Sequence, residues 1–492
     1  MTMHTTALFS PLRALARCAK CISLATLAVL VAGCAVGPAY ERPAAVQPAV
    51  YKEAEGWLPA APADTLARGP WWQLFGDPVL DQLADGIEVS NQNVAAAIAS
   101  YAQARALVRE QRAALFPSID LSGSGVRSSG QRSSATTGTS GTSAGSGGSG
   151  PSNQYRLNIG GSWEPDIWGR LRAGVAGANA GLDVSAAELA AARLSAQGEL
   201  AVNYFSLRQT DAQQVLLDAT IAGYQRVLQI TQNRFEAGIA AHADLLQAQT
   251  QLANTQADAV ALVRQRATFD HAIAVLLGKA PLDFSLDRAP WMVAVPDIPP
   301  GLPSTLLQRR PDIAAAERRV AVANEQIGIA RSAYFPSLNL TGSYGAGASG
   351  VAALFNASSS VWAIGVSAAQ NLFNAGATGA RVDAARAAHA QAVAQYRQTV
   401  LVAFADVENQ LAATRALTQQ QALRRIASSS ADQVEAQMLN RYRAGQVGYT
   451  DVVTAQVTAL NARRALVQLQ ADRQTTAVAL IQSLGGGWSA QP

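Results

Sequence analysis

The sequence predicts a mostly α-helical protein with a smaller β part, in which one structural unit is present twice. Residues 233–238 read NRFEAG and residues 440–445 read NRYRAG, and the same offset of 207 residues aligns the flanking segments without a gap. So long an ungapped register indicates an internal duplication. Two long proline-free intervals with apolar residues three or four apart predict long helices, whereas short alternating segments predict strands.

The first 33 residues have the pattern of a signal peptide. They carry Arg13, Arg17 and Lys20 without an acidic residue, and the apolar run that follows, residues 22–32, is too short to span a membrane. Removal of this segment lowers the formal net charge from +4 to about +1, so the mature chain has no basic excess for binding nucleic acid. It also leaves Cys34 as the one cysteine, which excludes an internal disulfide.

The signal ends in a sequence that resembles a bacterial lipobox, LVAGC at residues 30–34. In signals of that kind the cysteine becomes the first residue and carries a covalent lipid such as palmitate, so Cys34 is the predicted attachment site. The alternative is ordinary cleavage that leaves a free thiol, which is a liability in an oxidising compartment. We expect no cofactor apart from this lipid.

The chain of 492 residues is long enough for several domains. The predicted order is a signal peptide at 1–33, a lipidated extended tether at 34–70, a first structural repeat at 71–280, a proline-rich crossing at 281–310, a second structural repeat at 311–485 and a C-terminal tail at 486–492. Prolines favour extended backbone in both the tether and the crossing.

The first repeat begins with a helix. Asp77 can cap a helix that starts at Pro78 and runs to about Leu115. Alternation of apolar with polar residues then predicts two strands, joined through the Ser/Gly/Thr-rich loop 128–152 into a hairpin. Residues 166–280 contain no proline and predict long helices that fold back at least once, each on the order of 80 Å at ~1.5 Å per residue.

The second repeat follows the same order. Pro311 opens a helix, and FPS at residues 335–337 repeats FPS at 116–118 with an offset of 219. Two strands are expected near residues 338–344 and 362–366, followed by a second long interval without proline. The β-hairpin and the long helical pair are thus each predicted twice, with the longer hairpin loop in the first repeat.

The four predicted strands are each about ten residues long and alternate apolar with small or polar residues, which is typical of transmembrane β-strands. Four strands cannot close a barrel, because the smallest barrels have about eight and an open edge in lipid leaves backbone groups unpaired. We therefore expect the chain to oligomerise, with two or three copies closing the sheet. The alternative is a soluble domain with short edge hairpins, which fits four strands behind a lipobox less well.

The alanine-rich helices can pack closely side by side and still present a polar face to an aqueous lumen. A plain coiled-coil stalk is the structural alternative.

Six segments, in order, resemble the outer-membrane efflux ducts of the TolC type, in the lipoprotein branch labelled NodT or OprM-like. They are residues 37–43 (GPAYERP), 71–72 (WW), 163–170 (WEPDIWGR), 308–313 (QRRPDI), 441–456 and 485–488 (GGGW). The resemblance covers essentially the whole mature chain. Two departures are Pro165, where that family more often has leucine, and the long loop 128–152, which bears on the external face of the pore.

The resemblance implies a homotrimer whose four strands per chain form one twelve-stranded barrel, continued across the periplasm by a long α-helical barrel. It implies an outer-membrane lipoprotein that is not an enzyme but a passive exit duct for drugs and other small toxic molecules. In that family a periplasmic adaptor joins the duct to an inner-membrane pump of the resistance-nodulation-division class. The alternatives are the duct of a type I protein-secretion system and a non-conducting, lipid-anchored helical scaffold.

The resemblance also implies that the inner end of the duct closes near the turn of the helical pair after the fourth strand. We expect that turn around residues 406–415. The candidates for the periplasmic gate are therefore Asp406, Glu408, Asn409, Leu411 and Arg415. The alternative for each is a lateral helix contact or a solvated pair, and ionic closure would be released by rotation of the helical pair.

Other motifs do not indicate a catalytic or metal site. Residues 345–350 match G-x-G-x-x-G, but a strand follows rather than a helix, so the match is interpreted as a hairpin loop. His242, His271 and His389 are isolated in the sequence and have no metal-ligand spacing. An enzyme needs convergent polar groups, which the sequence does not indicate.

Overall fold

The computed structural model describes residues 36–44, 51–53, 70–129, 151–291, 294–296, 298 and 310–486. The signal peptide, Cys34, most of the tether, most of the loop 128–152, part of the crossing 281–310 and the tail after residue 486 lie outside the described residues. Within the described ranges, none of the helices is sufficiently long and apolar to serve as a membrane span.

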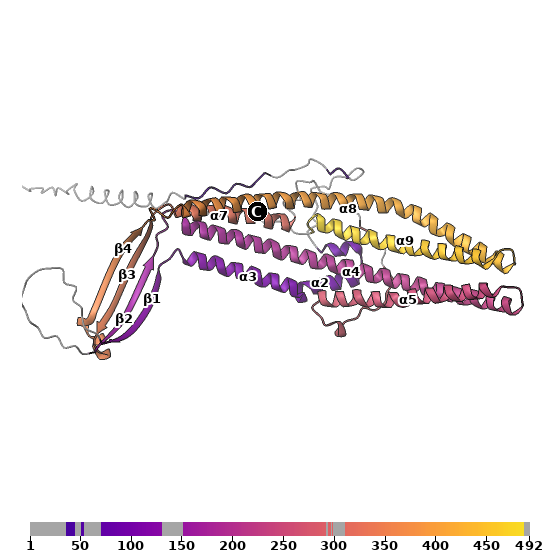
Figure 1. The fold of residues 1–492 in the computed structure, drawn as a ribbon, viewed down its shortest axis with the longest axis horizontal. Coiled ribbons are helices and arrows are strands. Elements are labelled where there is room, and N and C mark those ends of the chain that lie inside the picture. The colour runs from indigo at the N-terminus through magenta and orange to yellow at the C-terminus, as the bar shows by residue number, and fades with distance from the viewer. Residues whose placement is uncertain are drawn as a thin grey trace, which may run out of the picture. The chain divides into compact units, whose positions relative to one another are not determined.

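The chain forms two compact units (Figure 1). Unit 1 consists of Met1–Glu41, Ala104–Gly181 and Val320–Ala392, and it contains the β-sheet. Unit 2 consists of Arg42–Gln103, Leu182–Arg319 and Val393–Pro492, and it contains the two helical hairpins. Each unit takes segments from both repeats.

The described elements follow one another in the same order in each repeat. The first repeat contains the 3-10 helix η2 (Trp71–Phe75), α2 (Pro78–Ser90), α3 (Gln92–Ala113), β1 (Ser118–Ser128), β2 (Ser152–Trp163), α4 (Arg170–Glu236) and α5 (His242–Leu276). The second contains α7 (Pro311–Ser332), β3 (Ser337–Ala348), β4 (Ser360–Ala369), α8 (Ala377–Arg443) and α9 (Tyr449–Ser483). Short 3-10 helices lie in the connections: η3 (Pro281–Asp283), η4 (Val351–Phe355) and η5 (Ala357–Ser359).

The structure confirms the internal duplication. Helices α4 and α8 both have 67 residues, α5 and α9 both have 35, and both pairs are related by the offset of 207. Helices α3 and α7 both have 22 residues and are related by the offset of 219. The two offsets differ by 12 residues, and this difference falls within the first β-hairpin and the segments that follow the strands.

The helix predicted from Pro78 to Leu115 is two helices. As predicted, the Asp77 carboxylate caps the first, accepting hydrogen bonds from the backbone N–H groups of Val79 and Leu80 at 3.0 and 3.3 Å. The prediction of one continuous helix is wrong because Asn91 has extended backbone and separates α2 from α3. Its side-chain oxygen accepts from two N–H groups of α3, and its amide donates to the carbonyl of Leu276 at 2.7 Å. The local hydrogen bonds of asparagine here replace helical ones.

The sheet in unit 1 is antiparallel with the order β1-β2-β3-β4 (Figure 1). Its register gives the two faces different characters. One row that crosses all four strands consists of Leu121, Ile159, Tyr344 and Trp362, and the next row, on the opposite face, consists of Ser122, Asn158, Gly345 and Val361. The four side chains of the first row are between 52% and 70% exposed. The chain therefore leaves an apolar sheet face uncovered, as membrane strands require.

A buried network of charges in unit 2 holds the segment after α5 against the helices. Asp211, which is 5% exposed, contacts the guanidinium groups of Arg208 at 3.3 Å and Arg266 at 2.7 Å. Arg208 also donates to the carbonyl of Asp287 at 2.8 Å, and Asp270 accepts from the N–H of Leu286. Asp270, which stands beside an isolated histidine in the sequence, thus has a structural role.

We predict that Gly278→Ala destabilises the protein more than Gly238→Ala does. Both glycines have positive φ, 65° and 73°, which costs a non-glycine residue roughly 1 kcal/mol. Only at Gly278 would the added Cβ lie 2.1 Å from a backbone atom, the carbonyl oxygen of Ser90. The clash should raise the loss to about 3 kcal/mol, measured by denaturant unfolding followed by helical circular dichroism. Equal losses in the two variants would contradict this packing.

Candidate functional site at the ends of the helical hairpins

The segment predicted to form the gate lies in the middle of a helix rather than at a turn. Helix α8 runs without a break from Ala377 to Arg443, and the turn follows at residues 444–448. The expected position of the turn, residues 406–415, is therefore wrong. The chain has neither glycine nor proline from residue 380 to 444, so no backbone signal ends the helix before Gly445.

Two of the predicted gate residues fasten the tether to α8 within unit 2. Glu408 accepts hydrogen bonds from the backbone N–H groups of Lys52 and Glu53 at 2.6 and 2.9 Å. Arg415 donates to the carbonyl of Glu53 at 2.5 Å and contacts its carboxylate at 3.2 Å. These contacts hold an extended segment against the side of a helix.

Asp406 belongs to a second group of polar contacts, centred on Arg310. The Arg310 guanidinium lies between the carboxylates of Asp312 and Asp406, at 2.7 and 3.2 Å, and donates to the carbonyl of Ser483 at 3.2 Å. Burial works to lower the pKa of Arg310, but the hydrogen bond and charge of Asp312, together with Asp406, raise it overall. Asp406 thus helps an always-charged arginine to cap the end of α9.

The other two predicted gate residues differ in exposure. Leu411 is fully buried and Asn409 is exposed. The structure therefore brings three of the five into polar contacts along α8 and places none of the five at a turn. Their role in a gate stays a prediction, and the ends of the two hairpins lie elsewhere.

The hairpin ends lie at the hexapeptide that occurs twice in the sequence. Helix α4 ends at Glu236 before a turn containing Gly238, and α8 ends at Arg443 before a turn containing Gly445. Both glycines have left-handed backbone, with φ of 73° and 77°. The N–H of Ile239 bonds to the carbonyl five residues earlier at 2.8 Å, and the equivalent bond in the second turn is 2.9 Å. Glycine ends both helices by the same left-handed cap.

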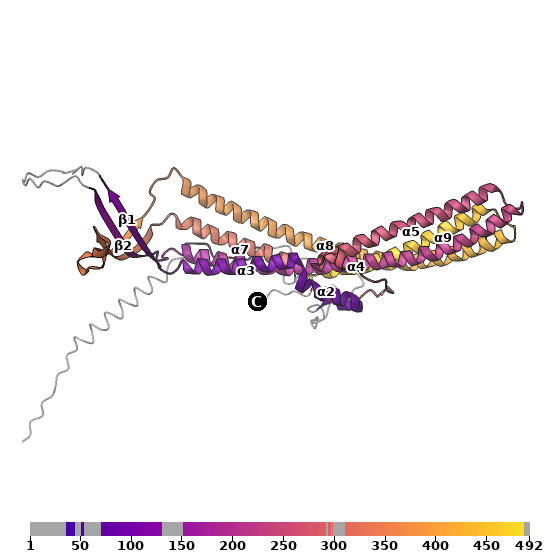
Figure 2. The ribbon, with the colours of Figure 1, turned by 90° about the horizontal axis from the view of Figure 1, so that it is seen from below.

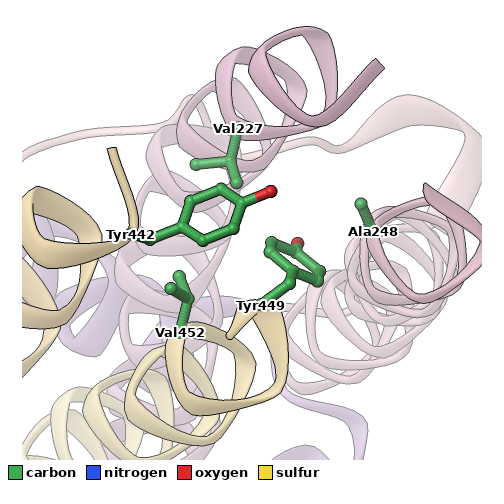
Figure 3. Close-up of a cluster of buried hydrophobic side chains, with 5 residues drawn as sticks. All are labelled: Val227, Ala248, Tyr442, Tyr449 and Val452. Carbon is green, nitrogen blue, oxygen red and sulfur yellow. The ribbon is translucent and has the colours of Figure 1, made fainter. Parts of the chain in front are cut away.

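Two tyrosines join the hairpin ends. Figure 3 shows Tyr442 and Tyr449 of the second hairpin among Val227 and Ala248 of the first and Val452 of the second. Their ring centroids are 5.5 Å apart, and each tyrosine is 2% exposed. Figures 1 and 2 both show the two hairpin ends side by side. The second turn is thus held against the first hairpin by a small apolar core.

Arg234 of the first hairpin caps the last turn of the second. Its guanidinium donates to the carbonyl of Tyr442 at 2.8 Å and lies over the Tyr442 ring, 4.7 Å from the centroid. The hydroxyl groups of Thr231 and Tyr442 are 3.3 Å apart. A cation at a helix C-terminus satisfies carbonyls that have no partner within the helix and stabilises their dipoles.

Burial raises the pKa of Tyr449, and the neighbouring Tyr442, Tyr224 and Asp244 add to this shift. The phenol of Tyr449 therefore stays neutral at physiological pH.

Polar contacts extend the contact between the hairpins along their length. Arg464 of α9 forms an ion pair with Asp258 of α5 at 2.9 Å, and the amide of Gln209 of α4 donates to Gln468 of α9. Near the turns, Thr450 and Gln247 are in hydrogen-bond contact at 3.5 Å. We call this whole contact of α4–α5 with α8–α9 the intra-chain seam.

The residues that form the seam were not predicted as site residues, although the sequence carried their signal. Arg234, Tyr442 and Gly445 belong to the repeated hexapeptide, and a glycine just after basic residues is a helix-end signal. The predicted folding back of the long helices within residues 166–280 is confirmed by the end of α4 at Glu236 and the start of α5 at His242. In the part of the chain that the structure describes, no group of three or more His, Cys, Asp or Glu residues could hold a metal ion.

Comparison with known proteins finds similarity over both repeats. The family model described as "Outer membrane efflux protein" matches residues 83–279 and 302–486. The antibiotic efflux pump outer membrane protein ArpC of Pseudomonas putida is 30% identical over 480 residues, which is 96% of each chain. The solvent efflux pump outer membrane protein SrpC of Pseudomonas putida is 31% identical over 470 residues, which is 94% of this chain and 97% of the relative.

A solved structure of the outer-membrane channel OprN has a similar fold. Its TM-score is 0.83 with 29% sequence identity, over 92% of this chain and 100% of that one. The predicted resemblance and the predicted fold class are thereby confirmed.

We predict that Arg234→Ala loosens the second turn locally. The substitution removes a charge-assisted hydrogen bond to Tyr442, which typically contributes about 1.5–3 kcal/mol. Hydrogen exchange of residues 444–448, followed by mass spectrometry, should therefore accelerate by about tenfold or more. Arg226→Ala, which changes an exposed arginine on the same helix, is the control and should leave this exchange unchanged. Equal hydrogen-exchange rates of residues 444–448 in both variants would contradict the capping role of Arg234.

Proposed function

The chain belongs to the outer membrane efflux protein family, and we propose that it is a homotrimeric exit duct for small apolar toxic molecules. It is the outer-membrane component of an efflux system. It lies in the outer membrane and extends into the periplasm. The observation that carries this function is the match to the family over both repeats, joined to a sheet with one apolar and one polar or small-residue face.

The need for several copies follows from the edges of the sheet. Within the described residues, β1 and β4 each pair with one neighbour only. An unpaired edge in lipid costs several kcal/mol per backbone group, so β1 of one copy would pair with β4 of the next. Two copies give eight strands and three give twelve; the resemblance to the duct family favours the trimer, which we propose as the closed form.

The substrate proposal rests on the relatives and not on a pocket. ArpC and SrpC are named for the export of antibiotics and solvents, and both substrate classes are small and largely apolar. We extend this to an inner-membrane pump of the resistance-nodulation-division class, joined through a periplasmic adaptor, as the source of energy. The duct itself needs no catalytic group.

Deletion of the gene should raise cell sensitivity to toluene and to apolar antibiotics, and the intact gene should restore resistance. The purified protein in a planar lipid bilayer should form conducting pores. Crosslinking from residues 237–241 in cells should capture an adaptor and a resistance-nodulation-division pump. Capture of an ATP-driven protein exporter would instead assign the duct to secretion, and a protein without conductance would be a scaffold.

We also propose that Cys34 carries the lipid, on the strength of the lipobox-like residues 30–34. Radioactive palmitate should label the intact protein, whereas Cys34→Ala should remove the label. Because the sheet would still insert, the variant should remain in the membrane fraction. Cys18→Ala, which changes a cysteine inside the signal, is the control and should keep the label. Labelling of Cys34→Ala would contradict the assignment.

A further inference from the structure

The apolar face of the sheet is partly covered at one end. The connection between β3 and β4, residues 349–359, contains η4 and η5 and lies against this face. Together with the sheet it forms a groove of about 340 Å³, within the range of small-ligand sites. The apolar side chains that line the groove include Leu121, Leu157, Ile159, Ala346, Leu354 and Phe355. The groove therefore lies on the face that we assign to lipid.

The position of the groove along the strands places it in the outer leaflet of the membrane. Helices α3 and α7 precede β1 and β3, and helices α4 and α8 follow β2 and β4, so all four strands join the helices at the same end of the sheet. Because the helices extend into the periplasm, the opposite end is external. Ala346 and Ser360, which line the groove, lie within two residues of the external ends of β3 and β4. The outer leaflet of a bacterial outer membrane consists mainly of phosphorylated glycolipid.

The segment that covers the groove suits apolar surroundings. Helix η4 consists of five consecutive apolar residues, VAALF, and its Val351 and Phe355 are 57% and 79% exposed. Ser359 donates its N–H and its hydroxyl to the carbonyl of Asn356 at 3.0 and 2.6 Å. The N–H of Asn356 bonds in turn to the carbonyl of Ala353 at 3.3 Å. A segment in lipid has to pair its polar groups internally, and these bonds do so while apolar side chains face outward.

A cation lies beyond the groove on the same face of the sheet. Side chains two residues apart in a strand share a face, so Arg127 follows Leu121, Gly123 and Gly125 on the apolar face of β1. It pairs with Asn153 of β2 and lies about 13 Å beyond Gly123, at ~3.3 Å per residue. Arg127 is exposed, and among the described residues it forms no ion pair. An arginine on a lipid-facing surface is tolerated near the interface, which is the level of the lipid phosphates.

An aromatic ring lies between the groove and Arg127. Tyr155 pairs with Gly125 of β1 and Ala348 of β3, one step beyond the groove on the same face. A Cβ added to Gly125 would lie 3.2 Å from two ring carbons of Tyr155, so the ring lies over this glycine. Tyrosine is enriched at the interface between membrane and water. The order along β1 and β2 is thus apolar groove, interfacial ring and cation, which matches the acyl chain, sugar and phosphate of a phosphorylated glycolipid.

We propose that the groove binds an acyl chain of a phosphorylated glycolipid of the outer leaflet and that Arg127 pairs with a phosphate of the same molecule. The inference goes beyond the proposed function, but it rests on it in requiring that the apolar face lie in the outer membrane. Arginine suits this role because its planar guanidinium donates two parallel hydrogen bonds to a phosphate. General contact of a sheet with lipid needs neither a groove nor a cation, so these two features distinguish a specific lipid site.

The test measures lipid binding to the purified, delipidated full-length protein by native mass spectrometry. The probe is lipid A, which carries phosphates and acyl chains on a pair of sugars. Phosphatidylglycerol, which has a phosphate and acyl chains without the sugars, is the comparison lipid. Lipid A should bind at about one molecule per chain, and its affinity should exceed that of phosphatidylglycerol by about tenfold or more.

Arg127→Ala should weaken the binding of lipid A by about tenfold or more, because it removes charge-assisted hydrogen bonds to phosphate. Arg156→Ala is the matched control. Arg156 is also exposed and lies on the neighbouring strand β2, but it shares the opposite, polar face with Asn158. The control should change the affinity by less than about twofold. Equal losses in the two variants would overturn the role of Arg127.

A second pair of variants tests the groove itself. Ala346→Phe places a ring in the groove and should weaken the binding of lipid A by about tenfold or more, because the ring takes the space of the acyl chain. Ala368→Phe adds the same ring to the same apolar face, beside Leu338 at the other end of the sheet, and should change the affinity by less than about twofold. Light scattering and pore conductance of every variant show whether the protein still assembles.

Two results would overturn the lipid site without touching the duct. Equal affinities for lipid A and phosphatidylglycerol would overturn the glycolipid as the occupant. Lipid A binding that neither Arg127→Ala nor Ala346→Phe weakens would overturn the groove, and a conducting oligomer in the same preparation would leave the proposed function standing. A protein that neither conducts nor stays in the membrane fraction would overturn the proposed function, and the lipid site with it.

Discussion

Backbone groups at a sheet edge must find partners where no water can reach them, and much of this structure depends on that requirement. The sheet ends in β1 from the first repeat and β4 from the second, so its two open edges belong to different repeats. The sheet thus has one open edge from each repeat to offer another copy.

The duplication conserves the positions of contacts more closely than the residues that make them. The end of α5 is capped by the amide of Asn91, which donates to the carbonyl of Leu276. At the equivalent end of α9, Arg310 donates to the carbonyl of Ser483. The asparagine needs no counter-charge, whereas the arginine is buried and needs Asp312 and Asp406 beside it. One neutral contact has therefore become a charged network at the same place in the fold.

Local patterns predicted the elements but not where distant segments meet. The strands and the Asp77 cap were predicted because alternation and capping act over a few residues. The break at Asn91 was missed because its side-chain amide donates a hydrogen bond to the carbonyl of Leu276, which lies 185 residues further along the chain. The turn was expected near Arg415 from the resemblance to the duct family, and the apolar period of three or four could not correct it, because that period shows that a helix exists without giving its length. Gly445, at the observed end of α8, is the last residue of the second copy of the repeated hexapeptide.

The intra-chain seam differs in its energetics from a contact between separate copies. The intra-chain seam forms between segments of one molecule, so it avoids the translational and rotational entropy that association of separate copies costs. It also has the ion pair of Arg464 with Asp258 and the tyrosine hydroxyl contact at Thr231. The two hairpins of one protomer are therefore held together without the cost of association that a contact between copies would carry.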